Sequence, residues 1–139
     1  MNLYAVHGVL QALAFGVLFP LGMAVALYRD SIGYNWFRLH VGIQAIAVIT
    51  MFIAVACVVI EKINRDTTYT YIEKTTPTHV VVGGLVVLLV CIQILWALVI
   101  RRFVPYSIWY NGHVILALGI VITGWINIYL GYRHYKTLA

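Results

Sequence analysis

The sequence has few charged residues, and acidic residues are the scarcest of them. Asp and Glu together number 4 among 139 residues, and all charged residues make up 9% of the chain. Soluble domains carry about a quarter of their residues as Asp, Glu, Lys and Arg, so this composition excludes an ordinary soluble protein. The near absence of carboxylates from the apolar segments also weighs against a proton relay or a transporter.

Cysteine is scarcer still, and its two positions exclude a disulfide framework. Cys57 and Cys91 both lie deep within long apolar stretches, where a small polarizable side chain packs well. The net charge of +5 comes from nine basic residues scattered over short polar connections. Because they form no basic patch, we expect no nucleic-acid partner.

Long apolar stretches dominate what is present, since 63% of the chain is hydrophobic and the mean hydropathy is +0.96. A transmembrane helix needs about 20 mostly apolar residues. The sequence therefore predicts an all-α fold, a four-helix transmembrane bundle forming a single domain over residues 1–139. We expect an integral, multi-pass membrane protein, and Lys and Arg divide too evenly between the two faces to orient it. The four predicted spans are residues 3–27, 36–60, 79–100 and 110–132.

Four histidines occur one per predicted span: His7, His40, His79 and His113. Each lies near the start of its helix, and successive helices run in opposite directions. His7 and His79 therefore share one level of the membrane, while His40 and His113 share another, roughly 20 Å away. Ionisable residues inside a membrane are costly and usually face the interior, where they pair or bind a ligand.

Two imidazoles at one level, without Cys, Asp or Glu, do not complete a tetrahedral zinc site. They match the two axial positions of a haem iron, whose other ligands come from the porphyrin. The CxxCH motif is absent, so the sequence predicts two non-covalent haems b, with His7 and His79 as one axial pair and His40 and His113 as the other. Interhelical hydrogen bonding is the alternative role for each histidine.

Other residues near the histidines fit a haem site. Arg38 is a candidate partner for haem propionates, with an interfacial, snorkelling arginine as the alternative. A Trp precedes His40 by four residues, and another precedes His113 by four, which is a faint internal repeat. Pro20 is expected to kink the first span. Small residues that would leave room for a flat macrocycle are Gly8, Gly42, Gly83, Gly84 and Gly112.

Four stretches carry a resemblance to the transmembrane core of the cytochrome b561 family. They are HGVLQALAFGVLFPLGMAVALYR, WFRLHVGIQ, HVVVGGLVVLLVCIQILWALVIRR and WYNGHVILALGIVITGWINIYLGY. The resemblance implies two haems b ligated by the four core helices, and electron transfer across a membrane, often from ascorbate. The sequence departs from the family pattern after His113, where the stretch VILALGI lacks a Gly-Arg pair. Members usually have one or two further helices flanking this core.

These observations favour an electron conduit, either independent or as a cytochrome subunit of a larger oxidoreductase assembly. Such a protein is an electron-transfer oxidoreductase rather than a hydrolytic or group-transfer enzyme. Its expected partners are the lipid bilayer, an electron donor such as an ascorbate-like reductant, an electron acceptor, and other membrane subunits or a second copy of the chain. The alternative is a structural or assembly subunit of a membrane complex without a redox role.

Overall fold

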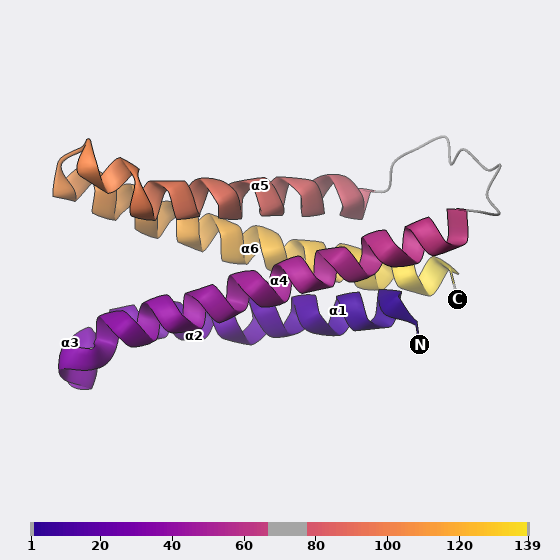
Figure 1. The fold of residues 1–139 in the computed structure, drawn as a ribbon, viewed down its shortest axis with the longest axis horizontal. Coiled ribbons are helices and arrows are strands. Elements are labelled where there is room, and N and C mark those ends of the chain that lie inside the picture. Colours follow the sequence, from indigo (N-terminus) through magenta and orange to yellow (C-terminus); the bar gives the residue numbers. More distant parts are fainter. Residues whose placement is uncertain (1, 67–77, 139) are drawn as a thin grey trace. The chain divides into compact units, whose positions relative to one another are not determined.

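A computed structural model describes residues 2–66 and 78–138, and these residues are almost entirely helical. They form two compact units, one in each half of the chain. We call residues 2–66 the first hairpin and residues 78–138 the second hairpin. In each of them one long helix runs back along the segment that precedes it (Figure 1).

The first hairpin pairs a continuous run of short helices with one long helix. Asn2 caps the first helix, because its side-chain oxygen accepts the N–H groups of Tyr4 and Ala5. Gly33 has a φ of 76°, which favours glycine, and it lies where the chain turns back. The elements are α1 (Leu3–Leu13), the π-helix η1 (Ala14–Leu18), α2 (Phe19–Leu27), α3 (Arg29–Ile32), the 3₁₀-helix η2 (Gly33–Asn35) and α4 (Trp36–Asp66).

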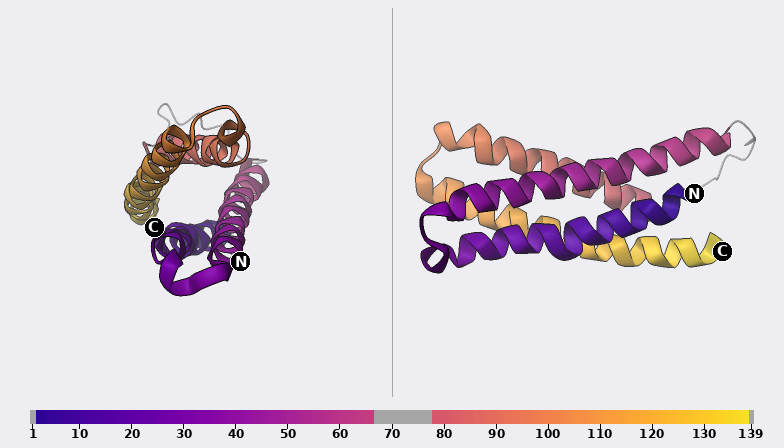
Figure 2. Two further views of the ribbon diagram at one scale, coloured as in Figure 1. Left: turned by 90° about the vertical axis from the view of Figure 1, so that its left-hand side faces the viewer. Right: turned by 60° about the horizontal axis from the view of Figure 1, so that its bottom comes forward.

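The second hairpin contains α5 (Thr78–Leu98), the 3₁₀-helix η3 (Ile100–Arg102) and α6 (Tyr106–Leu138), and α5 lies beside α6 in both views of Figure 2. Pro105 immediately precedes α6, and its carbonyl accepts the N–H of Trp109 at 3.0 Å in the first turn of the helix. Two tryptophan side chains then form reciprocal hydrogen bonds between α5 and α6. Trp96 Nε1 donates to the carbonyl of Trp109 at 2.9 Å, and Trp109 Nε1 donates to the carbonyl of Trp96 at 3.0 Å.

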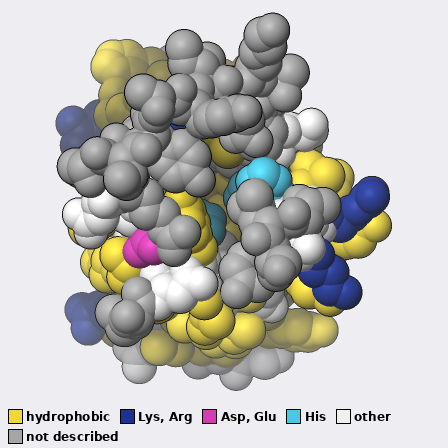
Figure 3. All heavy atoms as spheres, turned by 90° about the vertical axis from the view of Figure 1, so that its right-hand side faces the viewer, with side chains coloured by type: hydrophobic (Ala, Val, Ile, Leu, Met, Phe, Trp, Pro, Cys, Tyr) yellow, Lys and Arg dark blue, Asp and Glu magenta, His cyan; other side chains and the backbone are white. Residues whose placement is uncertain are grey.

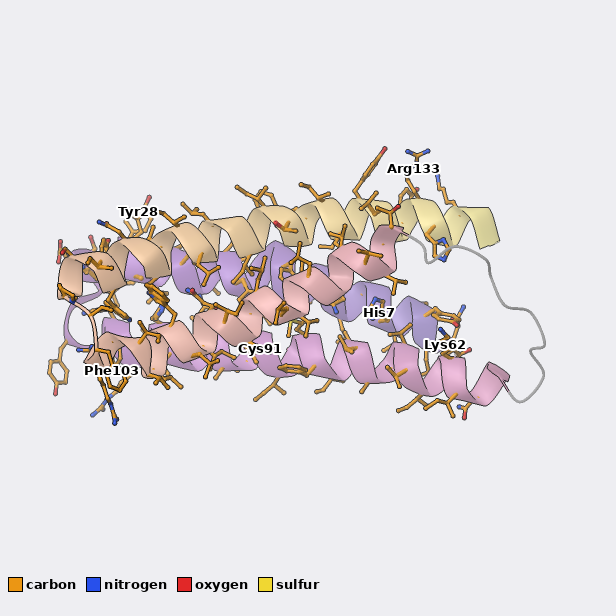
Figure 4. All side chains as sticks on the ribbon, turned by 90° about the horizontal axis from the view of Figure 1, so that it is seen from above. His7, Tyr28, Lys62, Cys91, Phe103 and Arg133 are labelled. Carbon is orange, nitrogen blue, oxygen red and sulfur yellow. The ribbon has the colours of Figure 1, made fainter. Side chains whose placement is uncertain are left out.

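Each hairpin has a connected end and an open end. In the first hairpin, Tyr28 marks the connection, and His7 and Lys62 lie toward the opposite end (Figure 4). In the second hairpin, Phe103 lies at the connection and Arg133 near the other end. The histidines near the starts of α1 and α5 therefore lie toward open ends, and those near the starts of α4 and α6 lie toward connected ends.

Many large apolar side chains are exposed on the described helices, and yellow predominates among the coloured side chains in the view of Figure 3. Ile49, Leu88 and Ile115 are each more than half exposed. Four helical segments of the described residues are long and apolar enough to cross a membrane: Leu3–Leu27, Arg29–Asn64, Thr78–Arg102 and Tyr106–His134. The predicted all-α class with four membrane spans is confirmed.

The helices extend beyond the predicted apolar limits. Trp36 begins α4 as predicted, but that helix continues to Asp66 and α6 runs from Tyr106 to Leu138. A helix makes its backbone hydrogen bonds within itself, so it can continue into water past the last apolar residue. The connection predicted for residues 28–35 is itself helical, formed by α3 and η2. A single domain over residues 1–139 stays a prediction.

The irregularity expected at Pro20 takes the form of a π-helix. Pro20 occupies the first turn of α2. The π-helix η1, over Ala14–Leu18, immediately precedes α2. Proline has no N–H for the carbonyl four residues earlier, so the regular α-helical ladder is interrupted there. A π-helical turn absorbs this interruption by including one extra residue.

We expect Gly112→Ala to destabilise the second hairpin. A Cβ added at Gly112 would lie 2.5 Å from Cζ2 of Trp96, a rigid ring that also holds Trp109. Overpacking of this kind costs about 1–3 kcal/mol. Thermal unfolding of the full chain in detergent measures the loss. The control is Gly119→Ala, since nothing lies within 4 Å of a Cβ built there; equal stability of the two variants would contradict the expected effect.

Candidate functional site

The two histidines of the first hairpin each contact a main-chain carbonyl of the opposite helix. Nδ1 of His7, on α1, lies 2.8 Å from the carbonyl oxygen of Ala54 on α4. Nδ1 of His40, on α4, lies 2.7 Å from the carbonyl oxygen of Gly22 on α2. A carbonyl can only accept, so Nδ1 carries the proton in both rings. Both side chains are part-buried.

The second hairpin repeats this arrangement with one difference. Nδ1 of His79, on α5, lies 3.0 Å from the carbonyl oxygen of Asn127 on α6. Nδ1 of His113, on α6, instead lies 3.0 Å from Nε2 of the Gln93 side chain on α5. The same Gln93 Nε2 donates to the carbonyl of His113 at 3.0 Å. Three histidines are thus anchored by main chain, and the fourth by a side chain.

One spacing along the chain relates three of the four contacts. Ala54 follows His40 by 14 residues, Gln93 follows His79 by 14, and Asn127 follows His113 by 14. Each of these residues anchors the other histidine of its hairpin. Fourteen residues make about four helical turns and about 21 Å, so a histidine and its +14 residue share one helix face at two levels. Each hairpin therefore has an approximate twofold internal repeat.

The π-helix η1 keeps the fourth contact in this pattern. Gly22 follows His7 by 15 residues rather than 14, and η1 lies between them. In a regular α-helix, one extra residue would rotate Gly22 by about 100° away from α4. Because a π-helical turn takes up one extra residue, His7 and Gly22 both face α4. The role of η1 is therefore to keep His7 on the same helix face as the Gly22 carbonyl that contacts His40.

Aromatic rings support two of the histidines to different degrees. The ring of Trp109 stacks on His113, with centroids 5.4 Å apart and planes 17° apart, and the Arg101 guanidinium lies 5.4 Å from the centroid of the Trp109 ring. Trp36 and His40 are tilted, with centroids 6.5 Å apart. The spacing of Trp and His noticed in the sequence thus gives ring stacking in the second hairpin and a looser contact in the first.

Glycines near the histidines divide into two groups. The space beside Gly83 is filled by the Asn127 side chain and that beside Gly112 by Trp96, so the expectation that both leave room for a macrocycle is wrong. These glycines let helices of one hairpin approach each other instead. Gly131, missed in the sequence, makes room for the His79 ring. Nothing lies within 4 Å of a Cβ built at Gly8, Gly42 or Gly84.

Arg38 is exposed and lies two residues before His40 on α4. Residues two apart on a helix do not share a face, so Arg38 and His40 lie at one level on different sides of α4. Its role toward propionates stays a prediction. Within residues 2–66 and 78–138, no three His, Cys, Asp or Glu side chains gather as a metal site. Buried side-chain oxygens without a hydrogen-bond partner there belong to Gln11, Gln93 and Asn127.

Anchoring at Nδ1 determines what the other ring nitrogen can do. When Nδ1–H donates to a carbonyl, the free lone pair lies on Nε2. This tautomer can bind a metal through Nε2. His7, His40 and His79 are held in this tautomer. Sequence reasoning located these histidines, but it missed the carbonyls of Gly22, Ala54 and Asn127. Their signal was the common spacing from the histidines.

Together these features define a multi-pass membrane protein whose helical hairpins present oriented imidazoles at two levels. The model of the family described as eukaryotic cytochrome b561 matches residues 6–138. The chain therefore belongs to the cytochrome b561 family, which binds haem and carries electrons across membranes. This membership confirms the resemblance of the sequence, and the family implies redox partners as well as a bilayer.

The chain is 28% identical over 139 residues to a cytochrome b561, DM13 and DOMON domain-containing protein of Arabidopsis thaliana. The match covers 93% of this chain and 14% of that protein. The chain thus corresponds to a small part of that relative's length. No solved structure matches.

The residues present fit a haem. The donor set consists of neutral imidazoles, and three of them are held by main-chain carbonyls in the tautomer that ligates through Nε2. Two imidazoles suffice for iron in a porphyrin, which supplies the other four ligands. His113 is the exception, because the N–H of Gln93 points at its Nδ1.

Deleting Val17 should preserve haem binding, whereas deleting Ile49 should reduce it. Both side chains are exposed, at 51% and 58%. Loss of Val17 shortens the His7 to Gly22 spacing to that of the other three pairs, so a regular helix keeps the register. Loss of Ile49 instead rotates Ala54 away from His40 by about 100°. The measurement is the haem content of purified protein; equal losses in both variants would refute the role of η1.

Proposed function

We propose that the chain transfers electrons across the membrane through two haems b. His7 with His79 hold one haem, and His40 with His113 hold the other. The observation that carries the proposal is the repeated anchoring of histidine Nδ1 at two levels of each hairpin. Family membership supplies haem binding, and the number of histidines and their levels support two.

Bound haem supplies an iron that takes up and releases one electron at a time. The histidines hold and orient it, and the main-chain carbonyls keep Nε2 directed to ligation without a side chain that moves. The apolar surfaces of the hairpins provide a low-dielectric surrounding, which influences the reduction potential. We propose Arg38 as a partner of the propionates, because a guanidinium binds carboxylates with two parallel hydrogen bonds.

The separation of the two histidine levels is large enough for electron transfer across most of the membrane. In the first hairpin His7 and His40 lie about 21 Å apart along the helices, since each is level with the anchoring residue of the other. This distance covers most of the hydrocarbon thickness of about 30 Å. Electrons from a small reductant such as an ascorbate-like donor enter at one face, and the acceptor takes them at the other. Other membrane subunits are further candidate partners.

Replacing each histidine by Ala should identify the axial pairs. His7→Ala and His79→Ala should each remove the same component of the reduced-minus-oxidised spectrum, and His40→Ala and His113→Ala should each remove the other. The control is His134→Ala, which lies near the carboxyl end of α6 and should keep both components. Removal of different components by His7→Ala and His79→Ala would contradict the proposed pairing.

Electron transfer itself is testable in proteoliposomes that enclose ferricyanide. Ascorbate added outside should reduce the enclosed ferricyanide with the full chain, and His40→Ala should slow this at least tenfold. A rate equal to that of protein-free liposomes, from haem-loaded protein, would refute the conduit. A colourless preparation would instead favour a structural subunit.

A further inference from the structure

His113 is the one position where the repeat of histidine contacts is broken. Its counterparts His7, His40 and His79 donate Nδ1–H to main-chain carbonyls. The residue that occupies the equivalent +14 position is Gln93, which presents its side chain. A main-chain carbonyl in a helix is fixed as an acceptor, but a carboxamide carries a donor at one end and an acceptor at the other.

The present orientation of Gln93 gives His113 a different tautomer. Gln93 Nε2 uses its two hydrogens on His113, one toward Nδ1 and one toward the carbonyl, each at 3.0 Å. An Nδ1 that accepts a hydrogen bond leaves the ring proton on Nε2, where it blocks ligation to a metal. Meanwhile Gln93 Oε1 is buried and has no hydrogen-bond partner.

Turning the carboxamide end over end allows the ligating tautomer of His113. The ring proton then moves from Nε2 to Nδ1, where Oε1 accepts it, and the lone pair on Nε2 becomes available for ligation. In exchange, Gln93 Nε2 gives up its hydrogen bond to the His113 carbonyl and takes the buried position that Oε1 held. The ring itself stays in place, because Trp109 stacks on it with planes 17° apart. Ligation at His113 and the orientation of Gln93 are thus linked.

We propose that Gln93 is a positioning residue for His113 that selects its ligating tautomer and tunes the haem it holds. This inference rests on the proposed function. Groups that accept the second N–H of a ligating histidine raise the basicity of the ligand and so favour the ferric state. At three histidines the acceptor is a main-chain carbonyl. At His113 it is a side chain, so one haem has a separately adjustable reduction potential.

The test is a spectroscopic redox titration of both haems in the full-length wild type and in two variants. Gln93→Glu keeps the length of the side chain and offers a stronger acceptor, so it should lower the potential of one haem. Gln93→Leu removes the acceptor and should raise it. We expect each shift to be about tenfold in the equilibrium constant for reduction, which is 59 mV for one electron. The other haem should keep its wild-type potential.

Electron paramagnetic resonance of the ferric protein gives a second readout, since the signal of the same haem should change. The matched control is Leu95→Ala, two residues along α5 and 57% exposed, which should move neither potential. A merely structural role would not give shifts of opposite sign. If Gln93→Glu binds both haems with unshifted potentials, the role of Gln93 is overturned, whatever Gln93→Leu does. A wild type without haem would overturn the proposed function, and this inference with it.

Discussion

A hydrogen bond from a histidine Nδ1–H to a main-chain carbonyl of the facing helix is the interaction on which the proposed site depends. It occurs at His7, His40 and His79, with distances from 2.7 to 3.0 Å. Side-chain hydrogen bonds between membrane helices contribute about 0.6 kcal/mol on average, so these bonds add little to stability. Their larger effect is orientation, since each fixes the ring and its tautomer at once.

The same constraint explains irregular features of the first hairpin. The carbonyl of Gly22 must face α4, and Pro20, two residues before it, interrupts the regular ladder. The π-helix reconciles the proline with the register by taking up one residue. Close packing of the helices then depends on glycines at contacts. A Cβ at Gly22 would meet Gln44, and one at Gly131 would meet His79.

Much of the fold followed from the sequence because its signals are local. Apolar length predicted four spans, and α4 begins at Trp36 as expected. Helix ends were less predictable, since α6 starts at Tyr106 because of Pro105 and continues past the apolar residues. The histidines were evident as ionisable residues in apolar helices. Their anchors were not, because a main-chain carbonyl leaves no residue type to recognise, and Gly22 and Ala54 look like packing residues.

The second hairpin shows the limit of reading residues by type. Gly112 was interpreted as room for a macrocycle, but Trp96 fills that space and joins Trp109 across the helices. Gln93 carried no signal alone, and its meaning comes from the spacing that it shares with Ala54 and Asn127. A repeat with one altered member identifies a position where the two proposed haem environments differ.

The most direct measurement is the haem content of the purified full chain, determined as the pyridine haemochrome and divided by the protein concentration. Two imidazole pairs predict two haems b per chain, and His40→Ala should reduce this to one. A ratio near zero in wild-type protein reconstituted with excess haem would contradict the account, because the anchored imidazoles would then have only a structural role.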